Sequence, residues 1–106
     1  MKLGNVSLIQ CDFSAAARAF IGKIDILHID GTHNYEAVKR DFEEWKKFVV
    51  PAGVILMHDT ISYLHHVGKF FEEIDGWFKL ERVESEGLGI LTRSEELHKN
   101  IKERWF

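Results

Sequence analysis

The segment IDILHID, residues 24–30, decides how this chain folds. Residues 24–29 form a nearly continuous apolar run, as expected for a strand that helices cover on both faces. The run ends in a carboxylate at Asp30, and an imidazole follows three residues later at His33. Polar side chains directly after a buried strand are candidates for function, because connecting loops carry many binding and catalytic residues.

Helix and strand patterns alternate after this strand. Asn34 is expected to cap an amphipathic helix whose apolar residues recur at spacings of three and four. The stripe consists of Tyr35, Val38, Phe42, Trp45 and Val49. Pro51-Ala52-Gly53 predicts a turn. Val54–Met57 predicts the next strand, which ends in His58-Asp59-Thr60.

Further elements are predicted on both sides of this centre. A strand at Val6–Gln10 and an alanine-rich helix at Ala15–Phe20 come first. A third helix follows the His58-Asp59-Thr60 segment, with Gly76 at its C′ position. The apolar stripes of this helix and of the last helix are Leu64, Val67, Phe71 and Ile74, and Leu97, Ile101 and Trp105. The remaining predicted segments are the strand Phe78–Val83, the hairpin loop Glu84–Gly87, the strand Leu88–Thr92 and the helix Ser94–Phe106.

This order of elements predicts a single α/β domain over residues 1–106. Three strands joined by helical crossovers should lie parallel, and the last two strands should form an antiparallel pair. We therefore expect a mostly parallel sheet of about five strands, flanked by helices.

Composition excludes several classes of protein. The chain of 106 residues has a formal charge of −3, so it lacks the basic surplus that nucleic acid or an anionic membrane would attract. Cys11 is the single cysteine, which rules out an intrachain disulfide and a cysteine-rich zinc site. The N-terminus lacks a signal-peptide pattern. These features favour a cytoplasmic protein.

We expect the polar residues to gather at one edge of the sheet, because the carboxyl ends of parallel strands lie together there. Ligands of open α/β sheets bind beyond this edge. Asp12, Asp30 and the pair His58-Asp59 each end a strand. Two carboxylates at adjacent strand ends suit Mg²⁺, and an imidazole would favour Mn²⁺, Fe²⁺ or Zn²⁺. Neighbouring residues on a strand face opposite ways, so His58 and Asp59 need a bend to act together.

Simpler interpretations stand beside this one. Asp12 and Asp59 both precede helices, where acids commonly cap the first turn. His33 could be an ordinary loop histidine, and the pair His65-His66 reads as surface. The spacing of the aromatic side chains is already explained by packing in a core.

Residues 24–60 resemble the later part of class I S-adenosylmethionine-dependent methyltransferases, and most closely their small-molecule O-methyltransferase group. The matching pattern is Asp30-Gly31-Thr32-His33-Asn34-Tyr35, then Val38 and Asp41, then Pro51-Ala52-Gly53-Val54-Ile55. The likeness extends from about Val6 to Arg93, and Ala52 stands where the family usually has a glycine.

The resemblance implies a partial Rossmann-like methyltransferase fold and a role for each strand end. Asp12, Phe13 and Asp30 would contact S-adenosylmethionine. Asp30 and Asp59, with His58, would hold a divalent metal, Mg²⁺ above all. His33 would be the catalytic base that deprotonates a small-molecule hydroxyl.

The resemblance also implies that the chain is the C-terminal portion of the fold. Nothing in Met1–Val6 matches the strand and glycine-rich loop with which these enzymes begin. Without the family's central strand, Ile24–Ile29 would present an open edge, a template for association. A rearranged first strand, a homodimer or a missing N-terminal half could cover that edge.

Three functions therefore remain open. They are a part of a metal-assisted O-methyltransferase, a non-catalytic remnant that binds itself or a partner, and a small metal-binding hydrolase-like site. The absent glycine-rich loop weighs against the first as a complete enzyme, and the acids at the strand ends weigh against the second.

Overall fold

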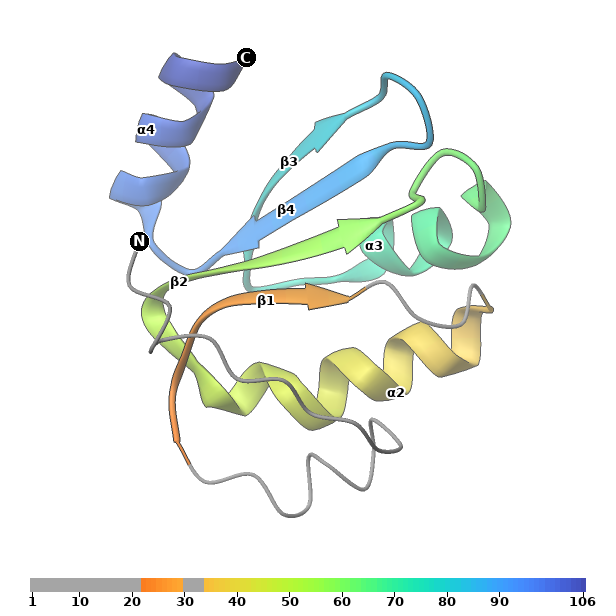
Figure 1. Cartoon of the computed structure of the whole chain (residues 1–106), viewed down its shortest axis with the longest axis horizontal. Helices are drawn as coiled ribbons and strands as arrows, with labels where there is room; N and C mark the ends of the chain where they lie inside the picture. The colour runs from red at the N-terminus through yellow and green to blue at the C-terminus, as the bar shows by residue number, and fades with distance from the viewer. Residues whose placement is uncertain (1–21, 30–33) are drawn as a thin grey trace, which may run out of the picture.

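A computed structural model describes residues 22–29 and 34–106 of the chain. They form a four-stranded sheet with the strand order β1-β2-β4-β3 (Figure 1). The strands are β1 Ile24–Ile29, β2 Val49–His58, β3 Phe78–Arg82 and β4 Leu88–Thr92. The α-helices are α2 Tyr35–Trp45, α3 Lys69–Glu73 and α4 Glu95–Trp105, with short helical turns at Lys46–Phe48 and Leu64–Gly68.

The sheet is mixed, so the prediction of a mostly parallel sheet is wrong for the described residues. β1 pairs with β2 in parallel, whereas β2 with β4 and β4 with β3 are antiparallel. The chain leaves β2 through α3, forms β3 at the outer edge and returns as β4 between β3 and β2. The hairpin therefore supplies half of the described strands. The predicted strand Val6–Gln10 and helix Ala15–Phe20 lie outside the described residues.

The helix α2 forms where the sequence predicts it. The Asn34 side chain caps it by accepting a hydrogen bond from the Ala37 backbone N–H at 2.8 Å. Val38, Phe42 and Trp45 are buried on its inner face. The predicted stripe runs one residue too far, because the helix ends at Trp45 and Val49 begins β2.

The predicted turn at Pro51–Gly53 is instead an irregular part of β2. Ile24 pairs with Val49, but Ile26 already pairs with Val54, so β2 carries extra residues against β1. Such a bulge accommodates a proline that cannot donate a ladder hydrogen bond. The strand is held here by the Thr92 hydroxyl, which donates to the Gly53 carbonyl at 2.9 Å.

The third predicted helix is divided. A π-helical turn at Leu64–Gly68 leads into α3, and Leu64 is 53% exposed, so its place in the apolar stripe was wrong. A Cβ on Gly68 would lie 2.3 Å from the Thr60 carbonyl, so this close approach requires glycine. Gly76 has a φ of +82°, but α3 is capped at Ile74, so Gly76 is C″ and not C′.

The helices α2 and α3 cover one face of the sheet, and the core lies beneath them. Ile55, Met57 and Leu91 are completely buried there. The other core residues come from β1, α2, the π-helical turn and α3 as well as β2: Leu27, Ile29, Val38, Phe42, Trp45, Val49, Val67, Phe70, Phe71 and Ile74. Alternate residues of the same strands point to the opposite face, since side chains on a strand alternate.

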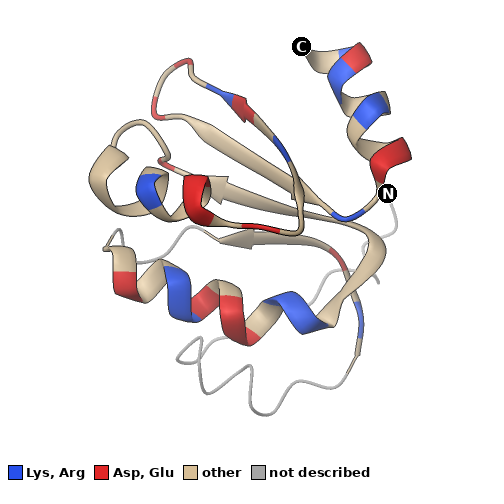
Figure 2. Cartoon of the chain, turned by 180° about the vertical axis from the view of Figure 1, so that it is seen from behind, with Lys and Arg blue, Asp and Glu red and all other residues tan. Residues whose placement is uncertain are grey.

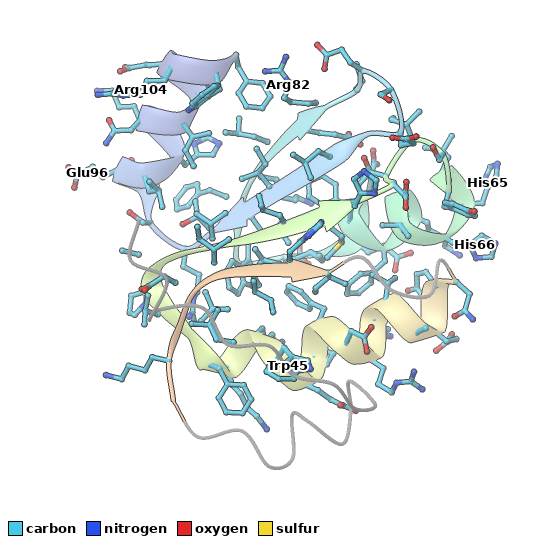
Figure 3. All side chains as sticks on the ribbon, in the orientation of Figure 1. Trp45, His65, His66, Arg82, Glu96 and Arg104 are labelled. Atoms are coloured by element: carbon cyan, nitrogen blue, oxygen red, sulfur yellow. The ribbon has the colours of Figure 1, made fainter. Side chains whose placement is uncertain are left out.

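The helix α4 lies over β3 and β4 on that opposite face (Figure 1). Ser94 caps it by accepting from the Leu97 backbone N–H at 3.1 Å. Leu97 and Ile101 are partly buried, but Trp105 is 66% exposed, so the predicted stripe fails at its end. The Arg82 guanidinium donates to the Trp105 carbonyl at 2.6 Å and lies over the Phe106 ring, which fixes the end of α4 (Figure 3).

Charges of both signs are mixed over the described surface. Figure 2 shows acidic and basic residues alternating along α2 and α4. None of the helices in the described part of the chain is long and apolar enough to cross a bilayer. Both observations agree with the composition.

Candidate functional site

The carboxyl end of β2 bends sharply, and the bend brings two ionisable side chains together. Asp59 has a φ of +70°, which takes it out of the alternation of the strand. As a result, Nδ1 of His58 lies 3.2 Å from Oδ2 of Asp59. The sequence required such a bend for these two neighbours to act together, and the structure contains it.

Burial differs between the two side chains. The Asp59 side chain is 9% exposed, whereas the His58 side chain is 35% exposed. A nearly buried carboxylate needs a positive partner or hydrogen-bond donors, because burial otherwise penalises its charge. The site thus has a fixed carboxylate at its base and an imidazole that solvent and ligands can reach.

The β3–β4 hairpin adds a third ionisable group. Oε2 of Glu86 lies 3.9 Å from Nε2 of His58, so the two nitrogens of the imidazole face two different carboxylates. His58, Asp59 and Glu86 each offer a ligand atom, and these atoms all lie within 4.8 Å of one another. They form the best candidate for a cation site in the part of the chain that the structure describes.

Backbone hydrogen bonds hold this hairpin against the end of β2. The Asp59 N–H donates to the Gly87 carbonyl at 3.0 Å, and the Ile61 and Ser62 N–H groups donate to the Glu86 carbonyl. Gly87 has a φ of +90°, and a Cβ there would lie 2.5 Å from Oγ1 of Thr60. Gly87 therefore supplies a backbone angle that other residues rarely adopt at the end of the predicted hairpin loop, and the loop is built for close contact with residues 59–62.

Asp30, His33, Asp12 and Phe13 lie outside the described residues. What the structure does place is the strand that leads to Asp30. Ile29 pairs with Met57, so the ends of β1 and β2 are adjacent, as the sequence predicts. The rings of His28 and His58 are also neighbours on this part of the sheet, with centroids 6.2 Å apart.

Asp59 is not the N-cap of the following helical turn. Tyr63 occupies that position, and no side-chain hydrogen bond caps the turn. The simple capping interpretation of Asp59 is therefore wrong. His65 and His66 lie on the surface of the turn, as expected, although Nδ1 of His66 also accepts from the Tyr35 backbone N–H (Figure 3).

Sequence reasoning missed Glu86. Its signal was available in the topology, because a hairpin whose second strand pairs antiparallel with β2 begins beside the carboxyl end of β2. Which of the hairpin's two glutamates faces that end could not be predicted. Glu84 is turned toward Arg82 instead, with Oε1 3.3 Å from the guanidinium.

Two ionisable groups near these elements have shifted pKa values. A hydrogen bond to its own backbone N–H, helped by the Arg82 charge, lowers the pKa of the Glu84 carboxyl. A hydrogen bond from the Tyr35 hydroxyl to Glu73 raises the pKa of that phenol. Glu84 is therefore committed to Arg82, which leaves Glu86 as the hairpin's carboxylate at the site.

Oxygen and nitrogen donors at these positions can bind a divalent cation. Carboxylate oxygens suit Mg²⁺, Mn²⁺ or Ca²⁺, and an imidazole nitrogen adds preference for Mn²⁺, Fe²⁺ or Zn²⁺. A cation placed here would also lie beside the adjacent strand end that leads to Asp30. The chemistry of the donor set thus fits a metal ion.

Comparison with known proteins identifies the family. Residues 3–60 match the model of a family described as "Methyltransferase domain". The match covers more than half of the chain and includes β1, α2 and β2 with its site residues His58 and Asp59. The chain belongs to this methyltransferase family.

The chain is also similar to a curated protein. The chain is 33% identical over 85 residues to a protein of Sinorhizobium fredii (strain NBRC 101917 / NGR234) named "Uncharacterized protein y4gI". The aligned part is 74% of this chain but 9% of that protein. The chain therefore spans only a small part of the relative that it matches.

Proposed function

We propose that this methyltransferase domain takes part in S-adenosylmethionine-dependent, divalent-metal-assisted O-methyl transfer to a small-molecule hydroxyl. The observation that carries the proposal is the pairing of an imidazole and a buried carboxylate at the carboxyl end of β2, 3.2 Å apart. That edge is where α/β sheets bind their ligands. Family membership supplies the methyl-transfer chemistry, and S-adenosylmethionine is the donor that such a domain implies.

Each residue at the edge has a proposed role. Asp59 and His58, together with Asp30 from the neighbouring strand, hold the cation. His33 accepts the proton of the acceptor hydroxyl, because histidine is the side chain that most often serves as a general base. Asp12 and Phe13, with Asp30, contact the cofactor.

The bound cation would lower the pKa of the acceptor hydroxyl and fix its direction. The protein's part is to hold the hydroxyl oxygen in line with the methyl group and to take up its proton. The buried Asp59 carboxylate and the docked hairpin keep the site rigid, which such alignment requires.

A methyl-transfer assay tests the proposal. The chain would be incubated with labelled S-adenosylmethionine and a panel of small phenols and alcohols, with Mg²⁺ or with a chelator. We expect transfer that needs the cation and that Asp59→Asn lowers about 10–100-fold. Asp75→Asn, an exposed acid after α3, is the matched control. Loss of a general base costs about 10²–10⁴-fold, which is the expectation for His33→Ala.

Several outcomes would contradict the proposal. Transfer that is unaffected by a chelator and by Asp59→Asn would exclude the cation role. Absence of transfer to every acceptor, by a chain that binds neither cofactor nor cation, would favour the non-catalytic alternative. Hydrolysis without S-adenosylmethionine would favour the hydrolase-like alternative. A cytoplasmic location is proposed with the enzyme, since its cofactor is made there.

Self-association is a second candidate function. β1 has a single strand partner among the described residues, and Ile26 is 67% exposed beside its open edge. A long apolar edge strand can pair with another chain. Light scattering should then report a dimer, and Ile26→Lys should shift the population to monomer. A monomer at high concentration would instead favour cover by residues 1–21 or by a missing N-terminal half.

A further inference from the structure

We infer that Glu86 is a metal ligand, and that His58, Asp59 and Glu86 form a transition-metal site that fastens the β3–β4 hairpin to the end of β2. The inference rests on the proposed function and deepens it, because it names a further ligand and the class of cation. Glu86 would join Asp59 and His58, which the proposed function already gives to the cation.

The donor geometry supports three ligands. Two donors bound to one ion at about 2.0–2.2 Å lie roughly 3–3.5 Å apart. Nδ1 of His58 and Oδ2 of Asp59 are already 3.2 Å apart. One ion binds a single imidazole nitrogen, and with one ligand atom from each residue the donors of His58, Asp59 and Glu86 all lie within 4.8 Å of one another. The Glu86 side chain is 57% exposed, so rotation of its carboxylate toward the ion would close the remaining gap.

The hairpin is placed for this role before any ion arrives. Three backbone hydrogen bonds join residues 86–87 to residues 59–62. The Ser85 hydroxyl donates to Oε2 of Glu86 at 3.3 Å, which directs the carboxylate. The fully buried Thr60 also places Oγ1 against Gly87, and this hydroxyl has no hydrogen-bond partner among the described residues. A polar atom of this kind points to a ligand or water at the site, since buried polar groups are normally satisfied.

The nitrogen and oxygen ligand atoms determine which class of cation the site prefers. A nitrogen donor with two carboxylates disfavours Mg²⁺, which prefers oxygen ligands and keeps its waters. It favours Mn²⁺, Co²⁺ and Zn²⁺, all of which accept imidazole readily. We therefore expect Co²⁺ or Zn²⁺ to bind at least about tenfold more tightly than Mg²⁺.

Calorimetric titration with Co²⁺, Zn²⁺ and Mg²⁺, together with the visible absorption of bound Co²⁺, tests the inference. Glu86→Gln should weaken Co²⁺ binding about 10–100-fold and change the Co²⁺ spectrum. Glu84→Gln, two residues away and paired with Arg82, is the matched control and should change neither.

Each other outcome overturns the inference in a distinct way. Equal weakening by Glu86→Gln and Glu84→Gln would mean a general electrostatic attraction. Binding of Mg²⁺ alone, lost in Asp30→Asn and unchanged in Glu86→Gln, would place the ion between the two strand ends. The proposed function would survive that result. It would fail separately if cation-dependent methyl transfer were absent.

Discussion

Neighbouring residues of β1 have opposite surroundings: Leu27 is 6% exposed beneath α2 and α3, and Ile26 is 67% exposed on the other face. The same contrast appears on β2, where Ile55 and Met57 are completely buried and His58 is partly exposed. One face is closed by two helices and supplies the core. The other is covered only over β3 and β4 by α4, among the residues that the structure describes. The same strands therefore supply a buried face that stabilises the fold and an open face that solvent can reach.

Substitution of the two β1 residues is the strongest test of that difference. Leu27→Ala removes a buried side chain and should lower the free energy of unfolding by about 2–5 kcal/mol. Ile26→Ala should change it by no more than about 0.5 kcal/mol. Urea unfolding followed by tryptophan fluorescence measures both. A loss for Ile26→Ala as large as that for Leu27→Ala would show that the open face is covered in solution.

Substitution of two loop glycines, Gly87 and Gly76, tests the hairpin contact beside the site. Gly87→Ala combines a positive φ with a clash against Oγ1 of Thr60, so it should cost about 2–4 kcal/mol. Gly76 has a similar φ but open space around it, so Gly76→Ala should cost about 1 kcal/mol. Unfolding experiments give both values.

The difference between the two glycine variants isolates the contact between the hairpin and residues 59–62. Cation binding should weaken in Gly87→Ala and stay unchanged in Gly76→Ala. Equal destabilisation by both, with cation binding intact, would contradict the docking of the hairpin.

The smallest expected effect lies on the covered side, where Tyr35 of α2 donates to Glu73 of α3. This hydrogen bond raises the pKa of Tyr35 above its ordinary value of 10.0. A raised pKa contributes stability that is present below the unfolded pKa and is lost as the pH rises through the folded value. Tyr35→Phe should remove this contribution, so the free energy of unfolding of the variant should lack the decrease that the original protein shows above about pH 10. An identical pH profile for both proteins would exclude the contribution.

Local patterns allowed the sequence to predict the covered face well. The stripe Val38, Phe42 and Trp45 was predicted from spacing, and the Asn34 cap from its residue type before the helix. The hairpin of β3 and β4 follows from equally short segments. Such features depend on residues that are close in sequence. The prediction that helices cover β1 on both faces is wrong for the described residues, because Ile26 is 67% exposed.

The wrong predictions concern features that depend on contacts between segments far apart in the sequence. Pro51–Gly53 is a turn by composition, but pairing with β1 turns it into a bulge within β2. Glu86 belongs to the candidate site because it lies near His58, which is 28 residues earlier in the chain. No periodicity in the sequence reveals such a contact. Trp105 fits the stripe of α4, yet its side chain is 66% exposed. Among the described strands, two of the three pairings are antiparallel, because β4 lies between β2 and β3.

Calorimetric titration of the chain with S-adenosylhomocysteine, with and without a divalent cation, tests the central claim most directly. We expect binding tighter than about 100 μM, equivalent to about 5.5 kcal/mol, and tighter with the cation than without it. That result would join the methyltransferase family membership to the site at the end of β2. Absence of detectable binding under both conditions would contradict the account of this chain as a cofactor-binding methyltransferase domain.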